Sequence, residues 1–298
     1  MPIEALDIYI AEKKPLIERA LDECLLGGAG RRASRVYEAM RYATLVGGKR
    51  LRALLVIAAA EALKHRAASV MKSACAVEFV HTTSLILDDL PSMDDAKMRR
   101  GQAATHLVFG EATAILAADA LLMEAFGLVA ENCLDAALPA HEAARAVRAL
   151  SYAIGPEGMI GGQQVDLEIV GKPADFETLE FICSHKTGAL FTACVELGAI
   201  LSRARDFELE ALENYAKNLG LAFQVRDDVL DEVGDPAKLG KDVHQDRNRT
   251  TFVSQFGLES ARKAVRELAK VAEDSLAALP VKSQPLAALA RYVAETEE

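Results

Sequence analysis

The stretch LILDDLPSMDDAKMRRG, residues 85–101, ends an apolar segment in a knot of acids and then reverses the sign of its charge. Its aspartates are Asp88, Asp89, Asp94 and Asp95, and its cations are Lys97, Arg99 and Arg100. Because Pro91 cannot continue a regular helix without cost, we expect the insert LPSM to bend the chain so that Asp94 returns towards Asp88. Bare carboxylates at the end of a buried segment repel each other and lose solvation, so this stretch favours a bound cation.

A second acidic stretch, FQVRDDVLDEVGD at residues 223–235, closes another apolar segment. Asp227 and Asp231 are four residues apart and so share one face of a helix, with Asp228 beside them. Mg²⁺ prefers one or two carboxylates, several waters and phosphate oxygens. Either cluster alone reads equally well as a solvated helix end. Two such clusters in one chain indicate a metal–diphosphate group framed between them.

Composition narrows the class of protein. The chain has 298 residues, of which 51% are hydrophobic but only 5% aromatic, a balance that suits packed helices. The net charge of −10 argues against general affinity for nucleic acid, which needs a basic face. Five scattered cysteines form no Cys-x-x-Cys pair, so we expect a reduced, cytoplasmic protein without disulfides. The N-terminus does not resemble a signal peptide, and we expect no stable membrane insertion.

Helical periodicity dominates the chain. Apolar residues recur mostly at three- to four-residue steps over residues 3–25, and residues 258–279 read as a last long helix with its charges on one side. Five segments are apolar on nearly every side, which predicts buried helices: residues 52–63, 69–87, 112–134, 179–201 and 209–233. We find no strand-like run, repeat or linker, and predict one all-α domain over residues 1–298.

Basic residues flank the acidic clusters. Lys49 and Arg52, in GGKRLR, are expected on one helix face, and His81 lies two helical turns before Asp88. Lys186 lies inside an apolar helix. Taken singly, these read as a solvated helix start, a core histidine and a lysine that snorkels to the surface. Together they suit diphosphate, which proteins grip with arginine and lysine.

At this point the chain resembles the trans-isoprenyl diphosphate synthases, specifically the short-chain farnesyl/geranylgeranyl type of bacteria and plastids. The motifs GGKRLR, SLILDDLPSMDDAKMRRG, GGQQVDLE, HKTGALF and FQVRDDVLDEVGD follow the family's order and spacing from about residue 30 to the end. The resemblance implies an all-helical bundle around a deep central cavity, usually a homodimer. It also implies three Mg²⁺ per site with substrate bound.

The resemblance assigns roles residue by residue. The metal-binding positions are Asp88, Asp89, Asp94, Asp227, Asp228 and Asp231. The isopentenyl diphosphate site is Lys49, Arg52, His81 and Arg100. The allylic diphosphate site is Arg99, Lys186, Thr187, Gln224, Lys241 and Arg249. The catalytic set comprises Asp88, Asp89, Asp94, Arg99, Lys186, Thr187, Gln224, Asp227 and Lys241. Gln163 and Asp166 match a segment between the two acidic motifs.

The implied reaction is a head-to-tail condensation. An allylic diphosphate ionises while metals and cations neutralise the leaving group, and the isopentenyl double bond attacks the resulting cation in an apolar cavity. The chain departs from the family pattern in a late loop, residues 239–252, that is shortened by about two residues, and in an acidic C-terminal tail. Both departures concern the closure of the site, and no metal-binding position is lost.

Product length depends on the helix that ends in Asp88. By resemblance, Thr83 and Ser84 set the floor of the product pocket, with Phe79 and Val80 one turn deeper. Because Thr83 and Ser84 are small, we expect the twenty-carbon geranylgeranyl diphosphate, with farnesyl diphosphate as the alternative. A terpene cyclase or head-to-head enzyme, a non-catalytic subunit of the same fold, and a longer-chain synthase remain open.

Overall fold

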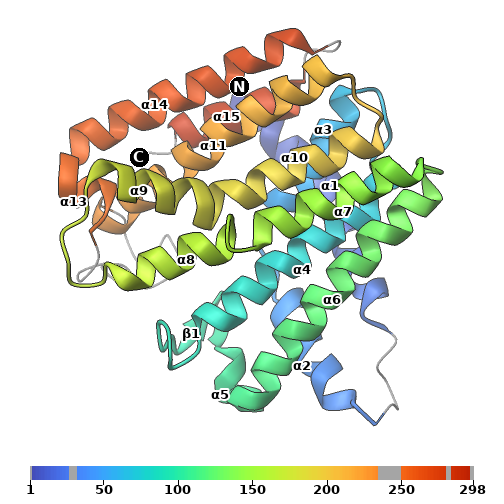
Figure 1. The fold of residues 1–298 in the computed structure, drawn as a ribbon, viewed down its shortest axis with the longest axis horizontal. Helices are drawn as coiled ribbons and strands as arrows, with labels where there is room; N and C mark the ends of the chain where they lie inside the picture. Colours follow the sequence, from blue (N-terminus) through green and yellow to red (C-terminus); the bar gives the residue numbers. More distant parts are fainter. Residues whose placement is uncertain (1, 27–31, 234–249, 280–282, 296–298) are drawn as a thin grey trace.

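The computed structural model describes residues 2–26, 32–233, 250–279 and 283–295, and this part of the chain is almost entirely helical (Figure 1). The α-helices are α1 (Pro2–Cys24), α2 (Ser34–Leu45), α3 (Leu51–Ala62), α4 (Met71–Asp88), α5 (Thr105–Phe109), α6 (Glu111–Asp135), α7 (Ala140–Ile154), α8 (Met159–Glu168), α9 (Phe176–Ile182), α10 (Ala189–Leu201), α11 (Asp206–Val233), α13 (Phe252–Phe256), α14 (Leu258–Ser275) and α15 (Gln284–Glu295). The shorter elements are the 3₁₀ turns η2 (Ala67–Val70) and η4 (Leu276–Ala278), the π-helical segment η3 (Cys183–Gly188), and a two-residue hairpin of β1 (Met98–Arg99) and β2 (Gln102–Ala103). The prediction of an all-α fold is confirmed.

The helices pack as a continuous series of neighbours. Helix α4 lies between α6 and α3, α3 packs on α10, α10 on α11, and α11 on α14, which α15 covers. The innermost members are buried on nearly every side, as the sequence predicts for residues 52–63 and 69–87. This order places the C-terminal ends of α4 and α11, where the two acidic clusters lie, on either side of α10 and η3.

Helix α6 differs from its prediction. Residues 112–134 were expected to be buried all round, but Leu116 and Met123 are 57% and 61% exposed. Ile115 is exposed on the same helix, and α5 adds exposed Leu107 and Val108. Hydropathy reports that a helix is apolar and does not report what covers it. We name this surface the α5–α6 apolar face.

Among the described residues, two helices are long and apolar enough to span a bilayer by length and composition alone. One is α4 with η2, and most of its apolar window is buried inside the protein, as in a core helix. The other is α6, whose exposed apolar residues form part of the α5–α6 apolar face.

Candidate active site

The first acidic cluster forms at the end of α4. The helix stops at Asp88, and the backbone N–H of Asp94 donates to the carbonyl oxygen of Asp88 at 3.0 Å. Asp95 adopts a left-handed φ of 48° in the same turn. The predicted return of Asp94 towards Asp88 is therefore confirmed.

Arg99 and Asp89 bind each other in this structure. The hairpin of β1 and β2 folds back beside α4, and Arg99 Nε donates to Asp89 Oδ1 at 2.9 Å. The Asp89 side chain is only 3% exposed, so its charge is neutralised by Arg99 rather than by water. Burial opposes charging of Arg99, but the bond to Asp89 raises the pKa of Arg99 overall.

Asp88 is the acid of this cluster whose ionisation is opposed by its surroundings. Burial raises its pKa to about 6, and the charges of Asp94 and Asp89 add to this shift while Lys186 opposes it. Gln163 of α8 donates from Nε2 to Asp88 Oδ1 at 3.0 Å. This carboxylate is costly to ionise and has like charges beside it. A bound divalent cation would offset both the burial and the repulsion.

The π-helical segment η3 connects the two clusters. Lys186, at its centre, binds Asp166 of α8 with Nζ and Oδ2 2.7 Å apart. Thr187 Oγ1 donates to Gln224 Oε1 of α11 at 2.7 Å. Such π-helical insertions occur often at functional sites. Here the adjacent side chains of Lys186 and Thr187 bind partners on two different helices, α8 and α11.

Two glycines let the neighbouring helices α8 and α11 pack with their backbones directly against η3. A Cβ on Gly162 of α8 would lie 2.2 Å from the backbone nitrogen of Lys186, and one on Gly220 of α11 would lie 2.8 Å from the Cα of Gly188. The backbones of α8 and α11 therefore touch η3 directly. These crossings lie one helical turn from Asp166 and Gln224, whose partners are Lys186 and Thr187.

The second acidic cluster lies along α11. Asp228 is 8% exposed and accepts from Gln224 Nε2 at 3.2 Å and from the backbone N–H of Phe252 at 3.0 Å. Asp227 and Asp231 are half-buried on the same helix. A pocket of about 90 Å³ is lined by Asp166, Lys186, Gln224, Asp228 and Phe252, among others. Lys186 and Asp228 thus share one pocket, while the charge of Lys186 also reaches Asp88.

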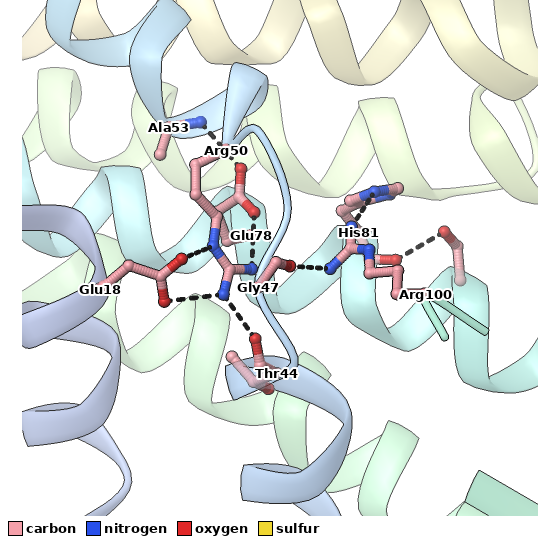
Figure 2. Close-up of polar contacts among 9 residues, drawn as sticks. Glu18, Thr44, Gly47, Arg50, Ala53, Glu78, His81 and Arg100 are labelled. Carbon is pink, nitrogen blue, oxygen red and sulfur yellow. Dashed lines mark hydrogen bonds and ion pairs between the residues drawn. The ribbon is translucent and has the colours of Figure 1, made fainter. Parts of the chain in front are cut away.

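A cluster of cations, Arg52, His81 and Arg100, adjoins the first acids, and Arg100 lines one pocket together with Asp89 and Arg99. Figure 2 shows two members of this cluster, His81 and Arg100, with Gly47. Arg100 donates from Nη1 to the carbonyl oxygen of Gly47 at 2.7 Å, and its Nη2 lies 3.3 Å from His81 Nε2. A guanidinium can only donate, so Nε2 of His81 accepts and the neutral ring carries its proton on Nδ1. Burial, with the charges of Arg52 and Arg100, lowers the pKa of His81 well below its usual range.

Two buried donors in this cluster have no partner among the described residues: His81 Nδ1 and Arg52 Nε. Burial lowers the pKa of Arg52 and of Arg100. Buried donors are normally satisfied, and buried cations are normally paired. The cluster is therefore built to receive an anion that offers several oxygen acceptors.

Lys49 does not share a helix face with Arg52. Helix α3 begins at Leu51, so Lys49 lies in the preceding turn, where Gly47 and Gly48 have positive φ and the helical pattern cannot extend backwards. Its Nζ donates to the hydroxyl of Tyr292 and lies 4.8 Å from the centre of that ring. Tyr292, on α15, was missed by sequence reasoning, because no local pattern links it to residues 49–52.

The carboxylate donors fit a hard divalent cation. Among the described residues, no three acidic, histidine or cysteine side chains are already gathered around a single ion position. Mg²⁺ does not require such a cage, because it takes one or two carboxylates and completes its shell with waters and phosphate oxygens. The raised pKa of Asp88 and the return of Asp94 towards it agree with this mode of binding.

The remaining site residues fall into two groups. Lys241 and Arg249 lie outside the described residues. The four chain-length positions lie on α4: Phe79 and Val80 are fully buried, Thr83 Oγ1 donates to the carbonyl oxygen of Ala118 on α6 at 3.0 Å, and Ser84 Oγ donates to that of His81. Thr83 therefore faces the seam between α4 and α6.

Comparison with known proteins agrees with this arrangement. The family model described as polyprenyl synthetase matches residues 33–282. A chloroplastic geranylgeranyl pyrophosphate synthase of Capsicum annuum is 40% identical over 291 residues, covering 96% of this chain and 78% of that protein. A geranylgeranyl diphosphate synthase of Cyanophora paradoxa is 37% identical, covering 96% and 94%. The crystal structure of an FPP/GFPP synthase from Zymomonas mobilis superposes with a TM-score of 0.87 at 34% identity, covering 99% and 100%.

Proposed function

Since this chain belongs to the polyprenyl synthetase family, we propose that it condenses isopentenyl diphosphate with allylic diphosphates, head to tail and with Mg²⁺, to give geranylgeranyl diphosphate. It is a prenyltransferase, the class of enzyme to which its geranylgeranyl diphosphate synthase relatives belong. Farnesyl diphosphate is the alternative product, because the Zymomonas mobilis relative is titled an FPP/GFPP synthase.

One observation carries the proposal. The cluster of Arg52, His81 and Arg100 holds buried donors that no described residue satisfies, and it adjoins the acids at the end of α4. An anion site beside a cation site is what two diphosphate substrates require, one held by basic side chains and the other through metal ions.

The allylic half of the site comprises the two acidic clusters and the segment between them. Asp88, Asp89, Asp94, Asp227, Asp228 and Asp231 are the residues that would hold Mg²⁺. When bound, the metal supplies charge neutralisation of the leaving diphosphate. Arg99 and Lys186 bind Asp89 and Asp166 in this structure, and both would turn from these acids to phosphate oxygens when the allylic substrate binds. We assign the hydrogen-bonded pair of Thr187 and Gln224 to the side of the developing allylic cation.

The isopentenyl half is the cation cluster. Arg52, Arg100 and His81 would donate to the diphosphate, with Lys49 as a further cation at the entrance. A bound anion stabilises the charged forms of these side chains, so it offsets the cost of burying their positive charges. No side-chain base is assigned, since the departing diphosphate can take the proton.

A product assay tests the function. Purified protein would be incubated with isopentenyl diphosphate and dimethylallyl diphosphate, with Mg²⁺ or with EDTA, and the dephosphorylated products separated by chromatography. We expect a twenty-carbon linear alcohol only with Mg²⁺. A clean fifteen-carbon product would favour the farnesyl alternative. Hydrocarbon formed from a single prenyl diphosphate without isopentenyl diphosphate would contradict the proposal in favour of a cyclase.

We also propose a homodimer located in the cytoplasm. The α5–α6 apolar face supports the dimer, because exposed Leu107, Leu116 and Met123 form the kind of patch that a second subunit buries. All five cysteines are unbonded thiols, which suits a reducing compartment.

A further inference from the structure

The turn that precedes α3 has an unusual backbone. Gly47 and Gly48 have φ values of 92° and 130°, and Arg50, which is not glycine, has a left-handed φ of 55°. Such a conformation costs an ordinary side chain about 1–2 kcal/mol unless its surroundings enforce it. The turn leads directly into Arg52, and its Gly47 carbonyl accepts from Arg100. Its shape therefore sets where two members of the cation cluster lie.

Arg50 is enforced by four contacts (Figure 2). Its Nε and Nη2 donate to the two carboxylate oxygens of Glu18 at 2.8 and 3.0 Å. Nη2 also donates to the carbonyl oxygen of Thr44 at 2.7 Å, and Nη1 lies 3.4 Å from Glu78 Oε2. The Arg50 side chain is 0% exposed. Burial opposes its charge, but Glu18 and Glu78 raise its pKa overall. Arg50 points away from the cation cluster and offers it no donor.

Glu78 connects this turn to the rest of the site. It is 1% exposed, and its Oε1 accepts from the backbone N–H of Ala53 at 3.1 Å, in the first turn of α3. On α4 it stands three residues before His81, on the neighbouring turn of the same face. One buried carboxylate thus joins the start of α3, which carries Arg52, to the helix that carries His81.

We propose that Arg50 and Glu78 are positioning residues for isopentenyl diphosphate: as a buried ion pair they hold the Gly47–Arg52 turn and α4 in the register that aligns the cation cluster on one diphosphate. This inference rests on the proposed function. Neither residue touches the substrate. Their effect should fall on the isopentenyl half, because their hydrogen bonds join Glu18, Thr44 and Ala53 near the start of α3, whereas Asp88 lies ten residues beyond Glu78 at the far end of α4. Lys186, Thr187 and Gln224 make contacts among α8, η3 and α11 that involve neither residue.

The sign of the effect separates positioning from charge. Glu78 is negative and lies close enough to Arg52 and Arg100 for its charge to act on both. If Glu78 acted only through its field, removing its charge would strengthen the binding of an anion. If it holds the turn in place, removing its ion pair weakens binding. Arg50→Lys keeps the charge but loses the fork that contacts Glu18 and Thr44 together.

The experiment measures steady-state kinetics of Arg50→Lys and Glu78→Gln with isopentenyl diphosphate and geranyl diphosphate. We expect the KM for isopentenyl diphosphate to rise at least fivefold in both variants. The KM for geranyl diphosphate and the kcat at saturation should stay within twofold of the wild type. A lowered or unchanged KM for isopentenyl diphosphate, or an equal rise for both substrates, would overturn the inference.

Glu61→Gln is the matched control. Glu61 also joins α1 to α3 through Tyr9 and Lys13, but at the other end of α3. It should lower thermal stability without moving either KM. If Arg50→Lys or Glu78→Gln fails to fold, Glu18→Gln tests the inference instead, because it changes only the partly exposed partner of Arg50. This variant should still raise the KM for isopentenyl diphosphate. Wild-type protein that shows no condensation contradicts the proposed function instead.

Discussion

Asp88 ends α4 with a carboxyl group that is costly to ionise. Its pKa of about 6 lies above its ordinary value of 3.8, so the folded protein holds this proton more tightly than the unfolded chain does. The stabilisation is complete at acid pH and is lost as the pH rises through 6. At neutral pH the metal-free protein therefore carries an energetic cost at this residue, which a bound cation would remove.

Asp88→Asn should stabilise the metal-free protein and inactivate it. In EDTA, we expect its Tm to exceed that of the wild type at pH 7.5 by roughly 2 °C or more, with a much smaller difference at pH 4. Turnover with Mg²⁺ should fall at least 100-fold. Differential scanning calorimetry at the two pH values measures the first effect. Asp95→Asn is the control, since Asp95 is exposed and pairs with Lys97. If the Tm of this control variant shifted with pH in the same way, the effect could not be assigned to the Asp88 carboxyl group.

Thr83 offers a test of product length. Its hydroxyl donates to Ala118 on α6, so a larger side chain must enter the seam between α4 and α6. If the product grows along this seam, as we propose, Thr83→Tyr should shorten the main product, because the ring would occupy that path. Thr83→Val, of nearly the same volume, should leave the product unchanged. Chromatography that shows equal chain lengths for the tyrosine variant and the wild type would remove Thr83 from the pocket.

At the scale of elements, α8 and α11 hold η3 by close contact of their backbones. Gly162→Ala would place a methyl group against the backbone of Lys186, so α8 or η3 must move and the pair of Lys186 and Asp166 must open. We expect kcat to fall at least tenfold. Gly127→Ala in α6, where a Cβ meets nothing within 4 Å, should instead stabilise the protein by about 1 kcal/mol without a change in kcat. Equal kinetics in the two variants would show that the crossing is not needed.

The elements also show how far sequence reasoning reaches. The nearly continuous apolar character of residues 52–63 and 69–87 predicted α3 and α4, because a helix that is buried on every side is apolar along its whole length. The π-helical η3 was not predicted, since one inserted residue hardly alters the apolar character of residues 179–201. The pair of Lys186 and Asp166 joins residues 20 positions apart, and the contact of Lys49 with Tyr292 joins residues 243 apart. Such pairs depend on how helices pack, which a single sequence does not encode locally.

At the scale of the whole molecule, the α5–α6 apolar face should join two subunits. Met123→Lys places a charge in that face, and desolvating it on association is costly. We expect the variant to elute as a monomer at concentrations where the wild type is a dimer, measured by light scattering after size exclusion. Val271→Lys is the control, since Val271 is an exposed apolar residue on α14, away from this face, and the variant should remain dimeric. A dimer in both variants would place the interface elsewhere.

The central claim is that the carboxylates of α4 and α11 grip a single metal–diphosphate group. The most direct test is calorimetric titration of inorganic pyrophosphate into the wild type, Asp88→Asn, Asp227→Asn and the double variant, each with and without Mg²⁺. We predict binding that requires Mg²⁺, weakens at least tenfold in either single variant, and is far from additive in the double variant. Binding that is independent of Mg²⁺, or that is unaffected by either substitution, would contradict the account.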